Sequence, residues 1–501
     1  MFTRKKLFSL MSLLLMSFLL LAACSSKDSS GDEDENGVPK IYIYSNTGSL
    51  NDRPEGSSKE ALEEIRQHII DEAGVHPVAI VPPKGTATEK LNLLLGSSND
   101  KVDVFQGSWD IYKDAIIPIN DLLDKHGQAI KAAWPEEAWA SVTDKDGNIW
   151  GVPRGGAGVT YPLWIRTDWL EKLDLEMPKT LDELEVVLEA FKQNDPDGNG
   201  ENDTIPILTD LKSMRMAFVG GFTESGYGNW LDSDGKMKPA ELAPGYKDFL
   251  AKMAEWYQKG YIYKESFSQY DQVEMFSTNR VGISAKWYSG ISLNVPKIKQ
   301  SIPEMEYEIV RGITGPKGFL QTANRGGSSG MLISKKAANP EAVMKFINWQ
   351  YENVENHITM EFGAQGKAWE WADDEKYYIK TLEDTSYAGE FQLSLGLPLE
   401  TKYSFDDPLR SKHAQYLAEE INQLEMVKMP IDINTVYNQN ILQEKVPNIG
   451  DIDRLIEEET IKFVMGARDL DEYDDFIDEL YKAGLDKWID AYTEIYDEQT
   501  K

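Results

Sequence analysis

The pattern of apolar and polar positions over residues 39–105 alternates between two periods. Short runs rich in β-branched and aromatic residues predict strands at 40–44, 75–81 and 102–105. Between the strands, apolar residues at helical spacing predict helices over 60–70 and 88–95. This β-α-β-α-β order predicts a mainly parallel sheet covered by helices. Because ligands of such sheets bind beyond the carboxyl ends of the strands, segments 45–47 and 106–109 become candidates for ligand contact.

A second region follows a glycine-rich stretch at 150–158, which we interpret as a crossing segment. Its first predicted helix begins after the capping box Thr180-Leu181-Asp182-Glu183. Another glycine-rich stretch, 312–330, precedes a predicted strand at 331–333, and Asn339-Pro340 then starts a helix over 341–351. From residue 452 onward the pattern predicts acidic amphipathic helices.

The N-terminus has the layout of a secretory signal. Arg4, Lys5 and Lys6 precede an apolar run from Leu7 to Leu21, which is shorter than the roughly 20 residues that span a bilayer. Small residues then lead to Cys24, the only cysteine of the chain. The segment resembles the bacterial lipobox, in which the cysteine becomes acylated and N-terminal after cleavage. We therefore predict a signal peptide at 1–23, lipidation of Cys24 and a flexible acidic tether at 24–38; the alternative is an uncleaved membrane helix.

Composition excludes some function classes. The chain has 501 residues and a formal net charge of −32, so its surface repels nucleic acid and anionic lipid headgroups. With one cysteine, no internal disulfide is possible. The five histidines show no helical zinc motif. The length suggests two or three domains or two large lobes, and we expect a monomer that binds no nucleic acid.

The sharpest chemical motif is the loop from Asp195 to Asp203. Oxygen-bearing side chains stand at the first, third, fifth and ninth positions of the loop and glycine at the sixth, as in an EF-hand calcium loop. Pro206 stands where that motif has its last, bidentate glutamate, so another oxygen must complete the coordination. The loop predicts a structural Ca²⁺ site; the alternative is an Asx-rich turn without an ion.

Aromatic residues are frequent, with 13 Trp and 23 Tyr, and several stand beside glycine or polar residues. Flat rings cover the C–H face of a sugar while polar side chains bond its hydroxyl groups, so the pattern favours a carbohydrate ligand. The alternative for each tryptophan is a half-buried place in the core.

The chain as a whole resembles extracellular solute-binding proteins of family 1, in particular the long lipoproteins of Gram-positive bacteria that serve oligosaccharide ABC importers. Periplasmic alginate-binding proteins are similar at a greater distance. The resemblance is carried by the lipobox and by the segments 150–153, 165–173, 178–191, 195–206 and 484–496. It implies a two-lobed α/β fold of the periplasmic-binding type II, with the ligand between lobes joined by crossing segments near 154–160 and 312–326. The N-terminal lobe would comprise 39–155 and 322–390, and the C-terminal lobe 156–321 and 391–501.

The resemblance also implies site residues and partners. The calcium ligands would be Asp195, Asp197, Asn199, Glu201 and Asp203, with Thr204 standing where relatives often have another acid. The residues that we expect to contact the sugar are Asn46, Gln106, Trp109, Tyr161, Trp164, Trp230, Trp287, Tyr288, Arg325 and Trp369. The partners would be an oligosaccharide, the permease subunits and the cell membrane, on whose extracellular face Cys24 anchors the protein.

We interpret the chain as a binding protein and not an enzyme, which closes around its ligand by hinge motion. A secreted glycoside hydrolase or polysaccharide lyase is one alternative, but no nucleophile motif or catalytic metal triad is evident. A surface receptor for a peptide or another solute is the other alternative, because a fold alone does not fix function.

Overall fold

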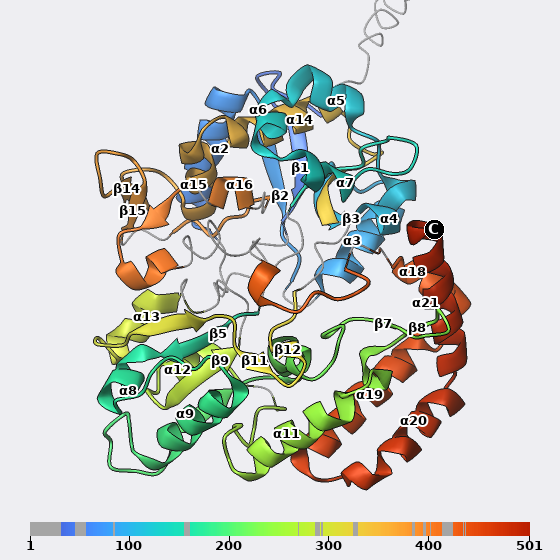
Figure 1. Cartoon of the computed structure of the whole chain (residues 1–501). Coiled ribbons are helices and arrows are strands. Elements are labelled where there is room, and N and C mark those ends of the chain that lie inside the picture. The colour runs from blue at the N-terminus through green and yellow to red at the C-terminus, as the bar shows by residue number, and fades with distance from the viewer. Residues whose placement is uncertain are drawn as a thin grey trace, which may run out of the picture.

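The computed structural model describes residues 32–45, 57–83, 86–154, 161–268, 270–285, 291, 294–323, 329–382, 386–393, 397–400, 402–412, 424–433, 435 and 437–501. These residues form two α/β lobes, one above the other in Figure 1. No described helix is both long enough and apolar enough to cross a membrane.

The upper lobe is built on a five-stranded sheet with the order β2-β1-β3-β13-β4. Strand β1 pairs in parallel with β2 and β3, and β13 runs antiparallel to β3 and β4. The strands are β1 (Lys40–Tyr44), β2 (His76–Ile80), β3 (Val104–Ser108), β4 (Val152–Pro153) and β13 (Ser329–Ile333).

Helices cover both faces of this sheet because its residues alternate between the faces. Ile41 and Ile43 pack in one cluster with Ile65 and Ile69 of α2 (Lys59–Ala73). Tyr44 packs on the other face with Leu91 of α3 (Ala87–Gly96). The first helix of this cover starts at Ser58, whose side chain accepts a hydrogen bond from the Ala61 N–H.

The lower lobe is built on a four-stranded mixed sheet with the order β10-β5-β9-β6. Its strands are β5 (Leu163–Arg166), β6 (Ile205–Leu208), β9 (Val281–Ala285) and β10 (Tyr307–Val310). One face packs against α9 (Leu181–Gln193), α11 (Tyr246–Gln258) and α19 (Ile449–Met465), and the other against α13 (Val295–Ser301). The predicted cap of α9 is present, because Thr180 Oγ1 accepts from the Glu183 N–H.

The remaining elements complete the two lobes. A small sheet of β14 (Trp369–Trp371), β15 (Tyr378–Thr381) and β16 (Ser404–Phe405) packs beside α15. The hairpin of β7 (Trp230–Leu231) and β8 (Met237–Lys238) and the pair of β11 (Thr314–Gly315) and β12 (Gly318–Phe319) belong to the lower lobe. The other helices are α4 (Trp109–Tyr112), α5 (Asn120–His126), α6 (Gln128–Ala133), α7 (Glu136–Ala140), α8 (Thr167–Lys172), α10 (Leu211–Phe218), α12 (Gln272–Phe276), α14 (Pro340–Glu352), α15 (Val354–Phe362), α16 (Leu397–Glu400), α18 (Gln439–Lys445), α20 (Tyr473–Lys482) and α21 (Leu485–Thr500).

As far as the described residues show, the chain passes between the lobes three times. It leaves the upper sheet after β4 and enters the lower sheet at β5, and it returns between β10 and β13. The third passage lies between Phe405, which packs in the small sheet, and Leu409, which packs in the core of the lower lobe. Residues 155–160 and 324–328, in the first two passages, lie outside the described residues.

Two boundaries differ from those expected from the sequence. Residues 32–38, assigned to a flexible tether, are docked on the upper lobe: Asp34 accepts hydrogen bonds from the N–H groups of Asn36 and Val38, and its carboxylate lies 3.0 Å from His76 Nδ1. Their apolar content is low, and the contacts of Asp34 with His76 and of Asp32 with Lys101 hold them on the lobe instead. Residues from 391 onward were assigned to the C-terminal lobe, whereas Phe391, Leu393 and Leu399 pack in the cluster of the upper sheet.

Candidate functional site

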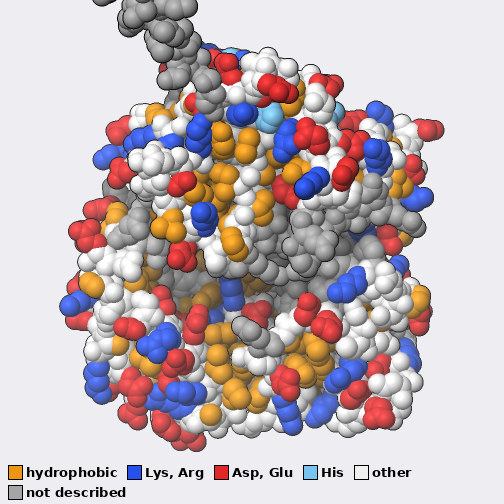
Figure 2. Space-filling view, turned by 180° about the vertical axis from the view of Figure 1, so that it is seen from behind, with side chains coloured by type: hydrophobic (Ala, Val, Ile, Leu, Met, Phe, Trp, Pro, Cys, Tyr) orange, Lys and Arg blue, Asp and Glu red, His pale blue; other side chains and the backbone are white. Residues whose placement is uncertain are grey.

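The carboxyl ends of β1, β3 and β4 lie at one edge of the upper sheet, beside the passages to the lower lobe. Gln106 lies on β3, opposite Met331 of β13, and Trp109 begins α4 directly after that strand; both side chains are half-buried. Viewed from behind, the surface is hollowed along the boundary between the lobes (Figure 2). This edge is where the sheet order predicted ligand contacts.

Trp109 is part of an aromatic stack. Its ring lies 6.3 Å from that of Trp150 with an interplanar angle of 9°, and Lys113 Nζ lies 5.4 Å and 4.9 Å from the two ring centroids. Trp109 Nε1 donates to the carbonyl of Ser141. The stack is therefore fixed by a hydrogen bond and by a cation over both rings.

Asp144, the first residue of the turn at 144–148, holds this stack in place. Its carboxylate accepts from Trp150 Nε1 at 2.9 Å and from Lys113 Nζ at 3.1 Å, besides the Asn148 amide. Burial raises the pKa of Asp144, but the hydrogen bonds from Trp150, Asn148 and Lys113 outweigh it and hold the pKa far below its ordinary value. Asp144 thus stays ionised and orients both partners.

On the lower lobe, Tyr161 lies two residues before the start of β5 and Trp230 begins the β7–β8 hairpin, both half-buried. Each carries a lysine over its ring: Lys212 Nζ is 5.2 Å from the Tyr161 centroid, and Lys238 Nζ is 5.6 Å from that of Trp230. Aromatic rings and ammonium groups are therefore paired on both lobes.

Two predicted sugar-binding tryptophans lie in the core instead. Trp164 is 1% exposed and packs edge-on against Tyr307, and Trp369 is 0% exposed, packs edge-on against Trp371 and donates to the Gly363 carbonyl. Both lie on strands, on faces covered by other elements, so neither ring offers a face to a ligand in this structure. The predicted residues Cys24, Asn46, Trp287, Tyr288 and Arg325 lie outside the described residues.

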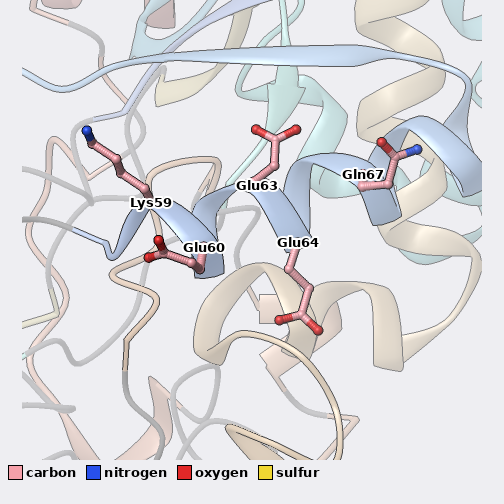
Figure 3. Close-up of a pocket in the computed structure, with 5 residues that line it drawn as sticks. All are labelled: Lys59, Glu60, Glu63, Glu64 and Gln67. Carbon is pink, nitrogen blue, oxygen red and sulfur yellow. The ribbon is translucent and has the colours of Figure 1, made fainter.

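A shallow surface depression of about 640 Å³ lies on α2 (Figure 3). It is lined by Lys59, Glu60, Glu63, Glu64 and Gln67, whose side chains point to different sides of one helix. Glu64 pairs with Lys367 at 2.7 Å, and Glu63 pairs with Arg66. These contacts are typical of a solvated helix face, and we assign no site there.

The acidic loop between α9 and β6 has the curled backbone that a calcium loop needs. Gly198 and Gly200 have positive φ values of 74° and 80°, and the Asp195 carboxylate accepts from the N–H groups of Gly198, Asn199 and Gly200. Asn199 Nδ2 donates to Asp197 at 2.9 Å and to Asp203 at 3.0 Å. An amide nitrogen therefore lies between two carboxylates, where a hard cation could draw in the same oxygens.

The carboxylates of the loop repel one another, and this repulsion adds to the effect of burial in raising a pKa. Burial, a hydrogen bond with Asp195 and the charges of Asp195 and Asp203 raise the pKa of Asp197 to about 6. Its Oδ1 atom is buried and accepts no hydrogen bond. Among the described residues, no three acidic, histidine or cysteine side chains converge as a metal-binding group. The donors are nevertheless all oxygens, which is what Ca²⁺ requires, and an unpartnered carboxylate oxygen remains available for it.

Two contacts between the lobes were not foreseen from the sequence. Asn438, which precedes α18, donates from Nδ2 to the carbonyl of Asp110 on α4 at 2.7 Å. Arg410, in the third passage between the lobes, donates from Nη1 to Thr381 Oγ1 at 3.0 Å. Neither residue stands in a recognisable motif, so only their positions in the fold identify them.

Two α/β lobes joined by three passages, with polar and aromatic groups at the strand ends between them, define a solute-binding protein of the hinged, two-lobed class. The chain belongs to the bacterial extracellular solute-binding protein family, whose model matches residues 62–356. Since that family binds solutes, membership agrees with the non-enzymatic role inferred from the sequence.

Curated relatives cover most of the chain. The fructooligosaccharide ABC transporter substrate-binding protein FusA of Streptococcus pneumoniae is 28% identical over 97% of both chains. The polygalacturonan/rhamnogalacturonan-binding protein YtcQ of Bacillus subtilis is 27% identical over 70% of each chain. Lipoprotein LipO of the same organism is 26% identical over 70% of this chain and 72% of its own.

Solved structures show the same fold. FusA in complex with kestose superposes with a TM-score of 0.64 at 25% identity, over 92% of this chain and 99% of that one. A FusA EF-hand mutant in complex with fructo-nystose gives 0.63 at 23%, over 92% and 99%. The alginate-binding protein AlgQ2 without calcium ion gives 0.63 at 21%, over 91% and 97%. The two-lobed α/β fold expected from the sequence is thereby confirmed.

Proposed function

We propose that this chain is the lipid-anchored, oligosaccharide-binding component of an ABC importer. The observation that carries the proposal is the boundary between the lobes, where the strand ends present Gln106, Trp109 and Tyr161 beside the passages that join the sheets. Its family membership and its similarity to FusA and YtcQ support a glycan as the solute.

Closure of the lobes around the glycan would provide the mechanism. A ligand that contacts both lobes binds the closed form more tightly than the open form and shifts the population toward it. Trp109 would cover the apolar face of a sugar ring while Gln106 bonds hydroxyl groups, and the permease would receive the closed form.

The test is a thermal-shift screen of the purified protein against neutral and acidic oligosaccharides, followed by small-angle scattering with each ligand that stabilises it. We expect a glycan that both raises the melting temperature and reduces the radius of gyration. A protein that binds no glycan, or that cleaves one with release of reducing ends, would refute the proposal.

The acidic loop would hold a structural Ca²⁺ with oxygens of Asp195, Asp197, Asn199, Glu201 and Asp203. The ion would neutralise the carboxylates that now crowd one another and would fix the connection between α9 and β6. A FusA structure described as an EF-hand mutant indicates that this relative has an EF-hand motif. A stabilisation of about 2.7 kcal/mol follows when free Ca²⁺ is a hundred times its dissociation constant.

Calorimetry of the protein in Ca²⁺ and in chelator tests this site. The melting temperature should rise with Ca²⁺, and Asp195→Asn should abolish the rise. Asp146→Asn is a matched control, because Asp146 is an exposed acid in another Asp-Gly turn. An equal response of the two variants would contradict the site.

The lipobox is the basis for proposing a lipid anchor, and similarity to LipO, which is named a lipoprotein, supports it. Expression in a Gram-positive host should place the wild-type protein in the membrane fraction, while Cys24→Ala should release it or leave it unprocessed. Detergent-phase partition and mass spectrometry of the N-terminus distinguish these outcomes.

A further inference from the structure

Arg410 is a buried cation that has no acidic partner among the residues that the structure describes. Its residue is 7% exposed, and its guanidinium carbon lies 3.6 Å from the centroid of the Phe405 ring. Nη1 donates to Thr381, and the buried Nε has no hydrogen-bond partner. No carboxylate of the described residues lies within ion-pairing distance of the guanidinium, although burying a charge is costly unless it is paired.

The two other buried arginines show what a structural arginine looks like in this chain. Arg166 forms two hydrogen bonds to Asp168, at 2.7 Å and 2.5 Å, and a third to Asn279. Arg215 lies 3.5 Å from Glu241 and bonds Tyr227 and Thr460. Arg215 Nε also has no hydrogen-bond partner, but both arginines have an acid beside them, whereas Arg410 is stacked on a ring and bonded to a single hydroxyl.

The acids near Arg410 are engaged elsewhere. Asp407 lies 3.7 Å from Lys299 and accepts from the backbone N–H groups of Leu409 and Arg410. Glu361 accepts from the Tyr403 hydroxyl at 2.7 Å, and Asp406 is exposed. Burial lowers the pKa of Arg410 in spite of these neighbours. The guanidinium therefore retains capacity for an additional anionic partner.

Arg410 lies between the lobes, so an anionic group that it binds would lie there as well. Leu409, its neighbour in sequence, packs in the core of the lower lobe, where the Tyr307 hydroxyl donates to the Leu409 carbonyl. Thr381 and Phe405 belong to the small sheet of the upper lobe. An anionic group bound by Arg410 would thus be held at the third passage, where both lobes contribute.

We propose that Arg410 binds the carboxylate of an acidic sugar, so that the ligand of this protein is a uronate-containing oligosaccharide. This inference rests on the proposed function and specifies its substrate class. The planar guanidinium bonds a carboxylate through two N–H groups, which a hydroxyl cannot match. A protein with a net charge of −32 has no general attraction for such a glycan, so a dedicated buried cation is required.

Titration calorimetry with matched ligands tests the proposal. The probes are a galacturonate trimer, a mannuronate trimer and the fully methyl-esterified form of each, which lacks the charge and differs otherwise by one methyl group per sugar residue. The wild-type protein should bind at least one free acid at least tenfold more tightly than its ester, and added salt should reduce that preference. Arg410→Met should abolish the preference and leave binding of the ester within about twofold.

Control variants separate a ligand contact from a structural role. Arg454→Met, at an exposed arginine of α19, should keep the preference for the acid. Arg410→Lys should retain part of it, because the charge remains without the planar fork. In the absence of glycan, Arg410→Met should not lower the melting temperature, whereas a structural arginine would lower it by several degrees.

The outcomes are distinguishable from those of the proposed function. Equal binding of acid and ester by the wild-type protein, or an unchanged preference in Arg410→Met, overturns the inference while oligosaccharide binding stands. Failure to bind any glycan of the screen overturns the proposed function itself. Should Arg410→Met not fold, Thr381→Val, which removes the one hydrogen bond that orients the guanidinium, must reduce the preference for the acid.

Discussion

Asp103 allows a quantitative test of the structure of the upper lobe. It lies just before β3, is 3% exposed, and accepts a hydrogen bond from the Tyr42 N–H at 2.8 Å. Burial is the largest cause that raises the pKa of Asp103, to about 6 from an ordinary 3.8, against the hydrogen bond from Tyr42. We expect Asp103→Asn to stabilise the protein above pH 6.

The sign follows from linkage between proton binding and folding. Because the folded state binds the proton of Asp103 more tightly than the unfolded state, the contribution of Asp103 to stability is greatest below pH 3.8 and is lost as the pH rises to about 6. The difference between the two pKa values corresponds to about 3 kcal/mol, an upper bound for the whole loss. Asparagine keeps the acceptor for Tyr42 and has no charge to bury.

The assay is urea denaturation of the wild-type protein and Asp103→Asn at closely spaced pH values from 3.5 to 8. Other titrating groups contribute equally to both proteins, so the difference in unfolding free energy isolates Asp103. This difference should rise in favour of the variant between pH 4 and 6 and then stay constant. A constant difference over the whole range, or a rise above pH 7, would refute the burial of an uncompensated carboxyl group here.

Three further predictions concern the lobes and their boundary. Trp109→Ala should weaken glycan binding at least tenfold with little change in melting temperature, whereas Trp369→Ala should lower the unfolding free energy by about 3–5 kcal/mol. Scanning calorimetry measures the effect on stability and titration calorimetry the effect on affinity. Equal effects of the two variants on affinity would contradict the placement of these rings. Asn438→Ala should increase the radius of gyration of the ligand-bound protein in small-angle scattering, since it removes the hydrogen bond to Asp110, and an unchanged radius would show that the contact is dispensable. Thr180→Ala should lower the unfolding free energy by about 1 kcal/mol through loss of the α9 cap, and Thr180→Ser should restore most of it.

Local elements of the fold could be predicted because their signals are local. The strand at 40–44 and the helix after Thr180 were expected at the positions where they lie, since period, composition and caps depend on neighbouring residues. That the chain stays in the upper lobe beyond residue 390 could not be foreseen, because it depends on packing of Leu393 and Leu399 against side chains far away in sequence.

The location and the kind of the candidate site could be predicted better than the residues that form it. Gln106 and Trp109 follow from strand order alone, since the ends of parallel strands share an edge. Trp164 and Trp369 have the aromatic rings that a sugar-binding site uses, yet both are buried. Their burial could not be predicted, because the neighbouring residues do not indicate which face of a strand other elements cover. Arg410 gave no signal at all, since the lack of an acidic partner is a property of the fold and not of the segment.

The three passages between the lobes determine how the molecule can move. A single connection would allow the lobes to twist and slide, but three connections restrict them mainly to a hinge rotation. The angle between the lobes is then the main quantity that changes when the protein opens or closes. A longer sugar chain would leave this angle larger instead of displacing one lobe sideways. A transporter that senses this angle would measure the size of its cargo without touching it.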